Sequence, residues 1–340
     1  MFGLKPPFYT DENYSGQTLD LLKDTTLGSN GAKYRHRGIE KRIGKLYHPL
    51  FLNLSMRNKL LANLTFCRRE KDWYIRYFAF NSIFQSAPQE NKIRTSSSKL
   101  KSKLASFFEN ALSVKDGPDV FYAYIDPRNE RSLNMSQFFG LKPIAEIATQ
   151  TFSRLKPKKA SLVCISDKAE IETLVSGQFG EYSFFHPYQT YQTEDSNFWV
   201  LKEKGEIIAF AKSYSAEWKI ERLPGKNGAL LTRLIPYIPV LRKLIRPGAH
   251  KFSVIDSVWV KNDDAQLFQT LAEGILFAES RNVLHWWVDK KDPLWNHIKD
   301  KTNWGLIHKI NGVHPVSLMA RGNKAITLDR PAYISGFDFI

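Results

Sequence analysis

The first part of the chain contains apolar runs separated by short polar turns, a pattern that predicts antiparallel strands. Apolar runs at 47–56 and 60–66 flank the polar residues 57–59, which is typical of a β-hairpin. A second polar turn, 68–72, leads into the aromatic and β-branched run 73–80, which favours a central strand. We therefore expect three antiparallel strands in a row.

The period then changes from strand-like to helical. Apolar side chains share one helix face in the segment that follows residues 95–98, where Ser97 or Ser98 would act as the helix cap. That face consists of Leu100, Leu104, Phe107, Phe108, Ala111 and Leu112. A strand at 120–125, a helix that opens at Pro127 and ends at Gly140, and a strand at 144–152 complete the expected mixed α+β domain.

The second half repeats this order of elements more loosely. The pattern predicts a strand at 160–165, a helix at 168–179, a hairpin at 198–212, a strand at 251–260, a helix at 265–279, a strand at 283–288 and a helix at 292–303. Residues 155–160 contain Pro and Lys and are expected to form a linker. We therefore expect two α+β domains, 1–157 and 158–340, each a mixed, mostly antiparallel sheet flanked by helices.

Composition confirms a folded chain and adds a strong positive charge. Aromatic residues make up 13% of the 340 residues, too many for a disordered chain, and the formal net charge is +15. Residues 1–157 carry 25 Lys and Arg against 14 Asp and Glu, whereas residues 158–340 carry 24 against 20. The basic cluster that motivates nucleic-acid binding consists of Lys33, Arg35, Arg37, Lys41, Arg42 and Lys45. No recognised nucleic-acid module accompanies it, so nucleic acid is not an expected partner.

Cysteine usage and terminal sequence bear on the compartment. Cys67 and Cys164 lie far apart in apolar stretches, without zinc-ligand spacing, so we expect two buried free thiols and no metal site. The apolar runs are too short for a signal peptide or a membrane span, and a cytoplasmic location is the expectation.

Residues 119–141 resemble the second half of a GNAT N-acetyltransferase. In that family a strand precedes an Asn that opens a helix, with a small residue three positions later and a Gly-aromatic pair eleven positions after the Asn. Asn129, Ser132 and Gly140 match this spacing, while Leu141 stands where an aromatic residue is usual. The resemblance extends by order of elements over residues 45–155, and the looser repeat resembles a second GNAT-like domain.

The resemblance implies a site for acetyl-CoA or a longer acyl-CoA as co-substrate. In the family two strands splay apart, the pantetheine arm pairs with one strand edge, and the pyrophosphate lies at a helix N-terminus, where free N–H groups attract anions. Beside pantetheine would lie Phe78, Ala79, Phe80 and Asn81. The pyrophosphate would be held by Arg94, Thr95, Ser96, Ser97, Ser98 and Lys99, with Asn129 and Ser132 also at the coenzyme site.

The sequence departs from the family pattern at several of these positions. Where the family's phosphate loop has Gly and, two residues later, Gly or Ala, this chain has Ser97 and Lys99. Serine lacks the backbone freedom of glycine beside a ligand, which predicts an altered coenzyme site. Ser136 stands where many members have a Tyr as general acid, and a hydroxyl is a poorer proton donor than a phenol. For the general base the candidates are Glu70, Asp72 and His48 near strand ends.

Two features of the second half bear on its role. Its counterpart of the phosphate loop, 261–264, has no glycine and two carboxylates that would repel a pyrophosphate, so the first domain is the better acyl-CoA site. The segment 230–246 combines apolar residues with Arg233, Arg242, Lys243 and Arg246. Peripheral contact with anionic lipid and packing across the domain interface are the alternatives for it.

These observations leave two main hypotheses for function. The first is an acyl-CoA-dependent, acetyltransferase-like N-acyltransferase that acts on an amine of a small molecule, a lipid precursor or a protein. The second is a degenerate, non-catalytic tandem protein that uses the fold to bind a ligand or a protein, since fold alone does not carry function.

Overall fold

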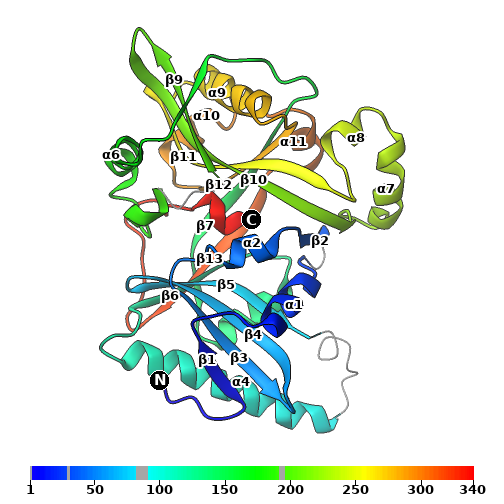
Figure 1. The fold of residues 1–340 in the computed structure, drawn as a ribbon, viewed down its shortest axis with the longest axis vertical. Helices are drawn as coiled ribbons and strands as arrows, with labels where there is room; N and C mark the ends of the chain where they lie inside the picture. The colour runs from blue at the N-terminus through cyan, green and yellow to red at the C-terminus, as the bar shows by residue number, and fades with distance from the viewer. Residues whose placement is uncertain (1, 29–30, 82–90, 191–195) are drawn as a thin grey trace. The chain divides into compact units, whose positions relative to one another are not determined.

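The computed structural model describes residues 2–28, 31–81, 91–190 and 196–340, with only the backbone of 91–99 and 189–190. The chain forms two compact units, and neither is a contiguous half of it (Figure 1). Unit 1 comprises Met1–Ser29, Gly38–Ile144 and Ser317–Thr327, and unit 2 comprises Asn30–Arg37, Ala145–Val316 and Leu328–Ile340. These bounds differ from a division after residue 157, because each half of the chain supplies one segment to the other unit.

Unit 1 contains a mixed sheet in the order β1-β3-β4-β5-β6-β13. Its strands are β1 (Phe8–Asp11), β3 (Pro49–Met56), β4 (Lys59–Arg69), β5 (Asp72–Phe80), β6 (Val120–Ile125) and the part of β13 (His314–Gly322) from residue 317. Its helices are α1 (Gly16–Asp24), α2 (Ile39–Ile43), α4 (Asn91–Ser113) and α5 (Glu130–Phe138). The expected hairpin and central strand are confirmed as β3, β4 and β5.

Aromatic packing fixes α4 on one face of this sheet. Phe107 and Phe108 of α4 are fully buried, and their rings lie within 6.1 Å of the ring of Phe66 on β4. Phe121 of β6 packs on Phe108 with 4.8 Å between ring centroids. The apolar face predicted from the sequence is therefore the buried face of α4. The described helix begins at Asn91, so Ser97 and Ser98 lie inside it and are not its cap.

Unit 2 contains a sheet in the order β7-β12-β11-β10-β9-β8, with β2 paired to the second half of β10. The strands are β2 (Lys33–His36), β7 (Lys142–Ser153, in this unit from residue 145), β8 (Leu162–Ile165), β9 (Ser196–Glu203), β10 (Glu206–Arg222), β11 (His250–Val260) and β12 (Val283–Asp289). The helices are α6 (Lys168–Phe179), α7 (Gly228–Leu234), α8 (Leu241–Leu244), α9 (Ala265–Ala278), α10 (Pro293–Ile298), α11 (Leu306–Asn311) and α12 (Gly336–Phe339). Short 3-10 turns lie at Pro187–Thr190, Ile235–Tyr237 and Lys261–Asp263.

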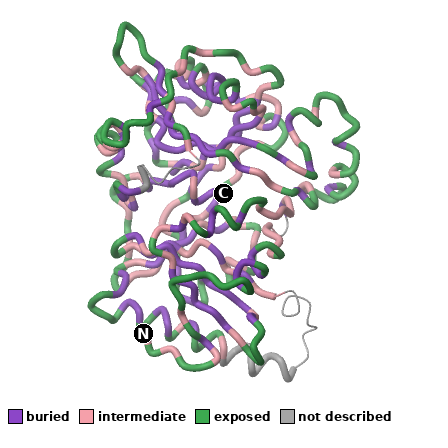
Figure 2. Tube along the Cα trace, viewed as in Figure 1, coloured by how far each residue is buried: buried purple, intermediate pink, exposed green. Residues whose placement is uncertain are grey.

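The expected α+β class, with a mostly antiparallel sheet in each unit, is confirmed. The described strand pairs are antiparallel apart from β5 with β6 and β11 with β12. Buried residues follow the strands of each sheet and the inner faces of the long helices (Figure 2). The helix expected at 292–303 is shorter, because α10 ends at Ile298 and the chain then turns into Trp304.

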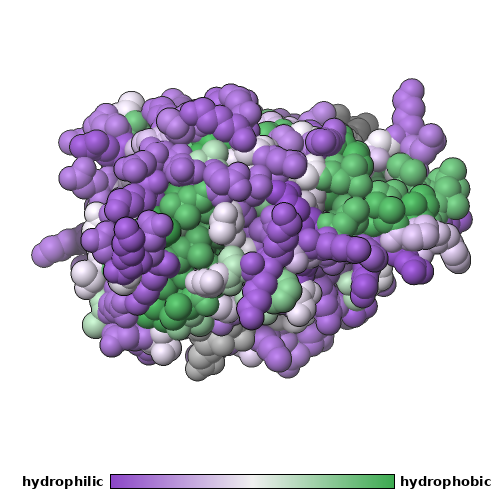
Figure 3. Space-filling view, turned by 90° about the horizontal axis from the view of Figure 1, so that it is seen from above, coloured by the Kyte–Doolittle hydropathy of each residue, from purple (hydrophilic) through white to green (hydrophobic). Residues whose placement is uncertain are grey.

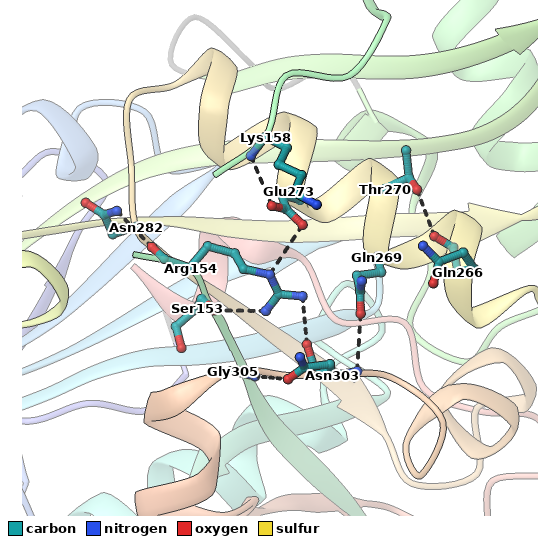
Figure 4. A network of polar contacts seen from close by, with 10 residues as sticks. All are labelled: Ser153, Arg154, Lys158, Gln266, Gln269, Thr270, Glu273, Asn282, Asn303 and Gly305. Carbon is teal, nitrogen blue, oxygen red and sulfur yellow. Dashed lines mark hydrogen bonds and ion pairs between the residues drawn. The ribbon is translucent and has the colours of Figure 1, made fainter. Parts of the chain in front are cut away.

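Residues 155–160 are not a linker between the compact units, because they lie inside unit 2 and are fixed to α9 (Figure 4). Arg154 Nε donates to Glu273 Oε2 of α9 at 3.3 Å, and the Lys158 backbone N–H donates to Glu273 Oε1 at 3.0 Å. A Cβ at Gly274 would lie 2.7 Å from the side chain of Ala160, so the helix and this segment approach closely. One carboxylate therefore holds both ends of the segment.

The structure also bears on the two cysteines and on membrane-spanning helices. Cys67 is buried as expected, whereas Cys164 is exposed on β8, because the outer face of this edge strand is open to solvent. Among the described residues, no helix is both long enough and apolar enough to cross a membrane.

Replacing Glu273 by Ala should destabilise unit 2. The change leaves the Arg154 guanidinium half-buried without its carboxylate, and such a loss costs about 3 kcal/mol of unfolding free energy. Glu203→Ala at the exposed end of β9 is the matched control and should change the unfolding free energy by less than about 0.5 kcal/mol. Urea unfolding of both variants measures the difference, and equal stability of the two would contradict this role for Glu273.

Candidate functional site

The candidate coenzyme site of unit 1 is the place where β5 and β6 separate. The parallel pairing is short: Asp72–Tyr74 of β5 pair with Val120–Tyr122 of β6. Both strands continue beyond it, β5 to Phe80 and β6 to Ile125. Beyond these residues β5 is bonded to β4 on one side, and its other edge faces the gap. This separation is the geometry that the family resemblance implied.

The structure places the expected pantetheine segment at the end of β5. Ala79 is buried, and Phe78 and Phe80 are half-buried with their rings 4.6 Å apart. The Asn81 backbone N–H donates to the Leu61 carbonyl at 2.9 Å, which extends the bonding to β4 by one residue. The segment therefore has one satisfied backbone edge and one edge directed toward β6.

Helix α5 brings the second expected group of coenzyme residues to the same end of the sheet. Asn129 is the N-cap of α5, and its Oδ1 accepts from the Ser132 backbone N–H at 3.2 Å. The Arg131 guanidinium lies 5.2 Å from the centre of the Phe80 ring. The first turn of α5 and the end of β5 are therefore neighbours, as the resemblance implied. Gly140 ends the helix with φ of 82°, a value that favours glycine.

The expected pyrophosphate segment lies only partly within the described structure. Arg94, Thr95, Ser96, Ser97, Ser98 and Lys99 belong to the first turns of α4, and their side chains lie outside the described residues. The residues that precede α4, 82–90, also lie outside them. The role of this segment in holding a pyrophosphate stays a prediction.

The structure does not bring the predicted bases to this site. Glu70 and Asp72 lie at the start of β5, and Asp72 pairs with Val120 at the start of β6. Eight residues of extended chain separate Asp72 from Phe80, which corresponds to roughly 26 Å. His48 lies at the same end of the sheet, where its carbonyl accepts from the Arg68 backbone N–H at 3.2 Å. The sequence pattern placed these three residues near strand ends, but it did not determine at which end of the folded sheet they would lie.

Ser136 lies on α5 but is not placed as a proton donor. Its side chain is buried, and its hydroxyl donates to the Leu133 carbonyl at 2.8 Å. This bond within the helix occupies the proton that a leaving thiolate would need.

A buried aromatic and cationic cluster on the other face of the sheet was missed from the sequence. The Arg69 guanidinium donates to the Tyr122 hydroxyl at 2.5 Å and lies 4.8 Å from the centre of the Tyr74 ring. Tyr124, two residues farther along β6, lies 5.4 Å from the Tyr74 ring and is half-buried. The alternation of aromatic residues in 120–125 was the available signal, because it places Tyr122 and Tyr124 on the face opposite Phe121.

The corresponding separation in unit 2 is occupied by the C-terminal segment of the chain. The parallel pairing here is also short: Ser253–Ile255 of β11 pair with Leu284–Trp286 of β12. Asp256, the next residue of β11, accepts from the Gly336 backbone N–H at 2.6 Å, and Asp289 at the end of β12 accepts from the Ala332 N–H at 2.8 Å. A Cβ at Gly336 would lie 2.9 Å from the Tyr214 ring, so glycine permits this close approach.

Burial changes the proton affinities of the groups around this segment. Burial lowers the pKa of Lys212 to about 8, and the Asp256 carboxylate opposes this shift. The pKa of Asp256 is raised by its burial, while Lys212 and the Gly336 N–H act in the opposite direction. Burial also lowers the pKa of His250 to about 4 and that of His285 to about 3. Lys212, Asp256 and His250 are buried in the interior of unit 2.

The start of α9 is closed as well. Asp264 is the N-cap, and its carboxylate accepts from the backbone N–H groups of Gln266 and Leu267 at 2.7 and 2.9 Å. These are the groups that would otherwise receive a phosphate. The Asp264 carboxylate therefore occupies the N–H groups at this helix start.

Part of the basic cluster near the N-terminus is neutralised inside unit 2. Arg35 of β2 forms an ion pair with Glu221 at 2.8 Å, and Arg37 forms one with Glu217 at 3.1 Å. Arg42 of α2, in unit 1, is buried. Two of these cations are therefore paired with carboxylates, and the third is buried.

Comparison with known proteins shows the fold and does not show a close relative. No protein-family model matches the chain, and no curated protein matches it. It resembles Saccharomyces cerevisiae N-myristoyltransferase with bound myristoyl-CoA, with a TM-score of 0.55 and 10% identity over 95% of this chain and 84% of that one. It also resembles a tandem GNAT protein from the clavulanic acid biosynthesis pathway, with a TM-score of 0.52 and 10% identity over 92% of this chain and 95% of that one. The chain therefore has the GNAT fold.

His250 and His285 should destabilise unit 2 as the pH falls below about 6.5, the usual histidine value, while the raised pKa values of Asp256 and Asp292, the latter about 6, act in the opposite direction. Because His250 and His285 have lowered pKa values in the folded state, the unfolded state binds more protons between pH 6.5 and pH 4. At 1.36 kcal/mol for each pKa unit, each histidine contributes a loss of about 3 kcal/mol at pH 4. His285→Gln should remove about half of this loss.

Urea unfolding from pH 7 to pH 4 measures the slope for the wild type and the variant. His297→Gln, at an exposed position of α10, is the matched control. An unchanged slope in His285→Gln, or an equal effect of the control, would contradict the assignment.

Proposed function

We propose that this chain is an acyl-CoA-dependent N-acyltransferase and that unit 1 holds the coenzyme. The observation that supports the proposal is the contrast between the two strand separations. In unit 2 the side-chain carboxylates of Asp256 and Asp289, one on each diverging strand, accept backbone N–H groups of the C-terminal segment. In unit 1, β5 continues to Phe80, six residues beyond its last residue paired with β6, and its end is the edge proposed for the coenzyme. The GNAT fold and the bound myristoyl-CoA of the yeast N-myristoyltransferase support an acyl-CoA as co-substrate.

In this proposal the coenzyme lies along the end of β5. The backbone edge of Phe78, Ala79, Phe80 and Asn81 pairs with the pantetheine amides, and Asn129 and Ser132 hold the start of α5 beside it. In this proposal Arg94 and Lys99, in the first turns of α4, provide the cations for the pyrophosphate. Acetyl-CoA and longer acyl-CoA molecules are both candidates.

The proposed reaction transfers the acyl group directly to an amine. The amine nitrogen attacks the thioester carbonyl carbon, a C–N bond forms, and the C–S bond breaks with its electron pair on sulfur. The amine loses one proton, and the thiolate takes up one. We propose the Tyr124 phenol as the proton donor, because it lies on β6 beyond the paired residues and on the face that α4 does not cover.

The second hypothesis, a non-catalytic binding module, has one observation in its favour. Ser136 occupies the position where the family often has a phenol, and its hydroxyl is bonded within its own helix. A protein that has lost its acid can still hold a coenzyme or another ligand. Ligand stabilisation without turnover on any amine would favour this alternative.

An acyl-CoA should stabilise the protein against heat. Ligand that binds only the folded state at 100 times its Kd adds about 2.7 kcal/mol. Titration with coenzyme A, acetyl-CoA and palmitoyl-CoA in a thermal-shift assay measures this and indicates the preferred chain length. The double variant Arg94→Ala, Lys99→Ala should lose most of the shift because it removes two cations at the pyrophosphate.

The control for this titration is Lys101→Ala with Lys103→Ala, which removes the same charge from the same helix at exposed positions. It should retain the wild-type shift. No shift of the wild type with any acyl-CoA would contradict the proposed function.

Tyr124→Phe should reduce turnover without weakening coenzyme binding. General acid catalysis contributes about 10²-fold or more, so we expect kcat to fall by about that factor while the acyl-CoA thermal shift is kept. Release of the coenzyme thiol, measured with an amine found by screening, gives kcat. Tyr9→Phe at an exposed position is the control. An unchanged kcat in Tyr124→Phe would exclude this phenol as the donor.

A further inference from the structure

The segment between β10 and β11 forms a projecting apolar surface on unit 2, which we call the α7–α8 surface. It consists of α7, the 3-10 turn Ile235–Tyr237 and α8. Of the fifteen large exposed apolar residues among the described residues, six lie within its eleven positions 230–240. They are Leu230, Leu231, Leu234, Tyr237, Ile238 and Val240, with exposed fractions from 40% to 83%. Figure 3 shows the apolar atoms gathered at the projecting side of the molecule.

The apolar residues are held in a fixed arrangement. Leu244 is buried in the core of unit 2, and Ile235 is buried beneath the turn. The Thr232 hydroxyl accepts from the Leu223 N–H at 2.9 Å and donates to the Gly228 carbonyl at 2.6 Å, which fixes the start of α7. The exposed side chains are therefore presented by an anchored backbone.

The charge around the α7–α8 surface has a single sign. Residues 222–246 contain six cations, all exposed, and no Asp or Glu. These cations are Arg222, Lys226, Arg233, Arg242, Lys243 and Arg246. Within the described part of the chain, no ion pair joins any of them to a carboxylate, in contrast to Arg35 and Arg37. An exposed apolar surface surrounded by these cations is complementary to a partner that has an apolar interior and negatively charged groups at its surface.

We propose that the α7–α8 surface docks this protein on an anionic lipid bilayer. Leu and Ile side chains would enter the acyl boundary, Tyr237 at the most exposed position would lie at the headgroup level, and the cations would meet lipid phosphates and carboxylates. A second copy of the chain is a poorer occupant, because a symmetric contact would bring two sets of six cations together.

The proposal is tested by sedimentation with phosphatidylcholine vesicles, prepared with and without phosphatidylserine. The full chain should bind the vesicles that contain phosphatidylserine and bind them less as salt is raised. Each Lys or Arg near an anionic surface contributes about a fivefold gain, so Arg242→Gln with Lys243→Gln should weaken binding roughly 30-fold. Leu234→Ser with Tyr237→Ser removes apolar side chains and should weaken binding at all salt concentrations.

Matched controls separate this surface from the overall charge of +15. Lys202→Gln with Lys324→Gln removes the same charge at exposed positions elsewhere, and Val163→Ser with Ile310→Ser removes exposed apolar residues elsewhere. All four variants alter exposed side chains, and thermal unfolding verifies that they fold. Absent binding to phosphatidylserine vesicles, or controls that weaken binding as much as the α7–α8 variants, would overturn the proposal and direct attention to a protein partner. Acyl-CoA binding is measured separately, so either result is distinguishable from a failure of the proposed function.

Discussion

Parallel strands that separate leave two facing backbone edges whose N–H and C=O groups no longer bond each other, and a folded protein must satisfy them in another way. Both units contain such a separation after three paired residues. In unit 2, Asp256 and Asp289 extend from the two diverging strands and bind the backbone of one segment. These carboxylates hold the C-terminal segment beside the separating strands of unit 2, whereas in unit 1 the end of β5 extends beyond its last residue paired with β6.

The closure of unit 2 has an electrostatic cost that its packing offsets. Asp256 is fully buried, and burial of a carboxylate is unfavourable unless donors and a cation surround it. Ser257, the Gly336 N–H and Lys212 supply these interactions. Phe339 of the same segment stacks on His285 with 5.4 Å between ring centroids. The segment therefore joins a polar cluster to an aromatic one.

The elements that local patterns determine were predictable from the sequence, and the ones that depend on distant partners were not. The hairpin of β3 and β4, the apolar face of α4 and the helix α6 follow from periodicity and turn residues. β2 has four half-buried residues and no alternation, and it is a strand only because β10 is long enough to pair with it. Asp256 and Gly336 are eighty residues apart, so no spacing in the sequence indicates their contact. The sequence placed Glu70, Asp72 and His48 near strand ends, but the end of the sheet at which each residue lies depends on how the strands pair.

The exchange of segments between the two halves of the chain affects the order in which the protein can fold. Residues 317–322 of β13 complete the sheet of unit 1 by pairing with β6, and Arg321 donates to the Phe139 carbonyl at the end of α5 at 2.6 Å. During synthesis the first 150 residues can form local elements early, but this sheet edge stays uncovered until the polypeptide has grown past residue 322. An uncovered strand edge pairs readily with other chains. Nascent unit 1 therefore exposes this strand edge until β13 has been synthesised, and a late segment of the chain protects an early one from pairing with other chains.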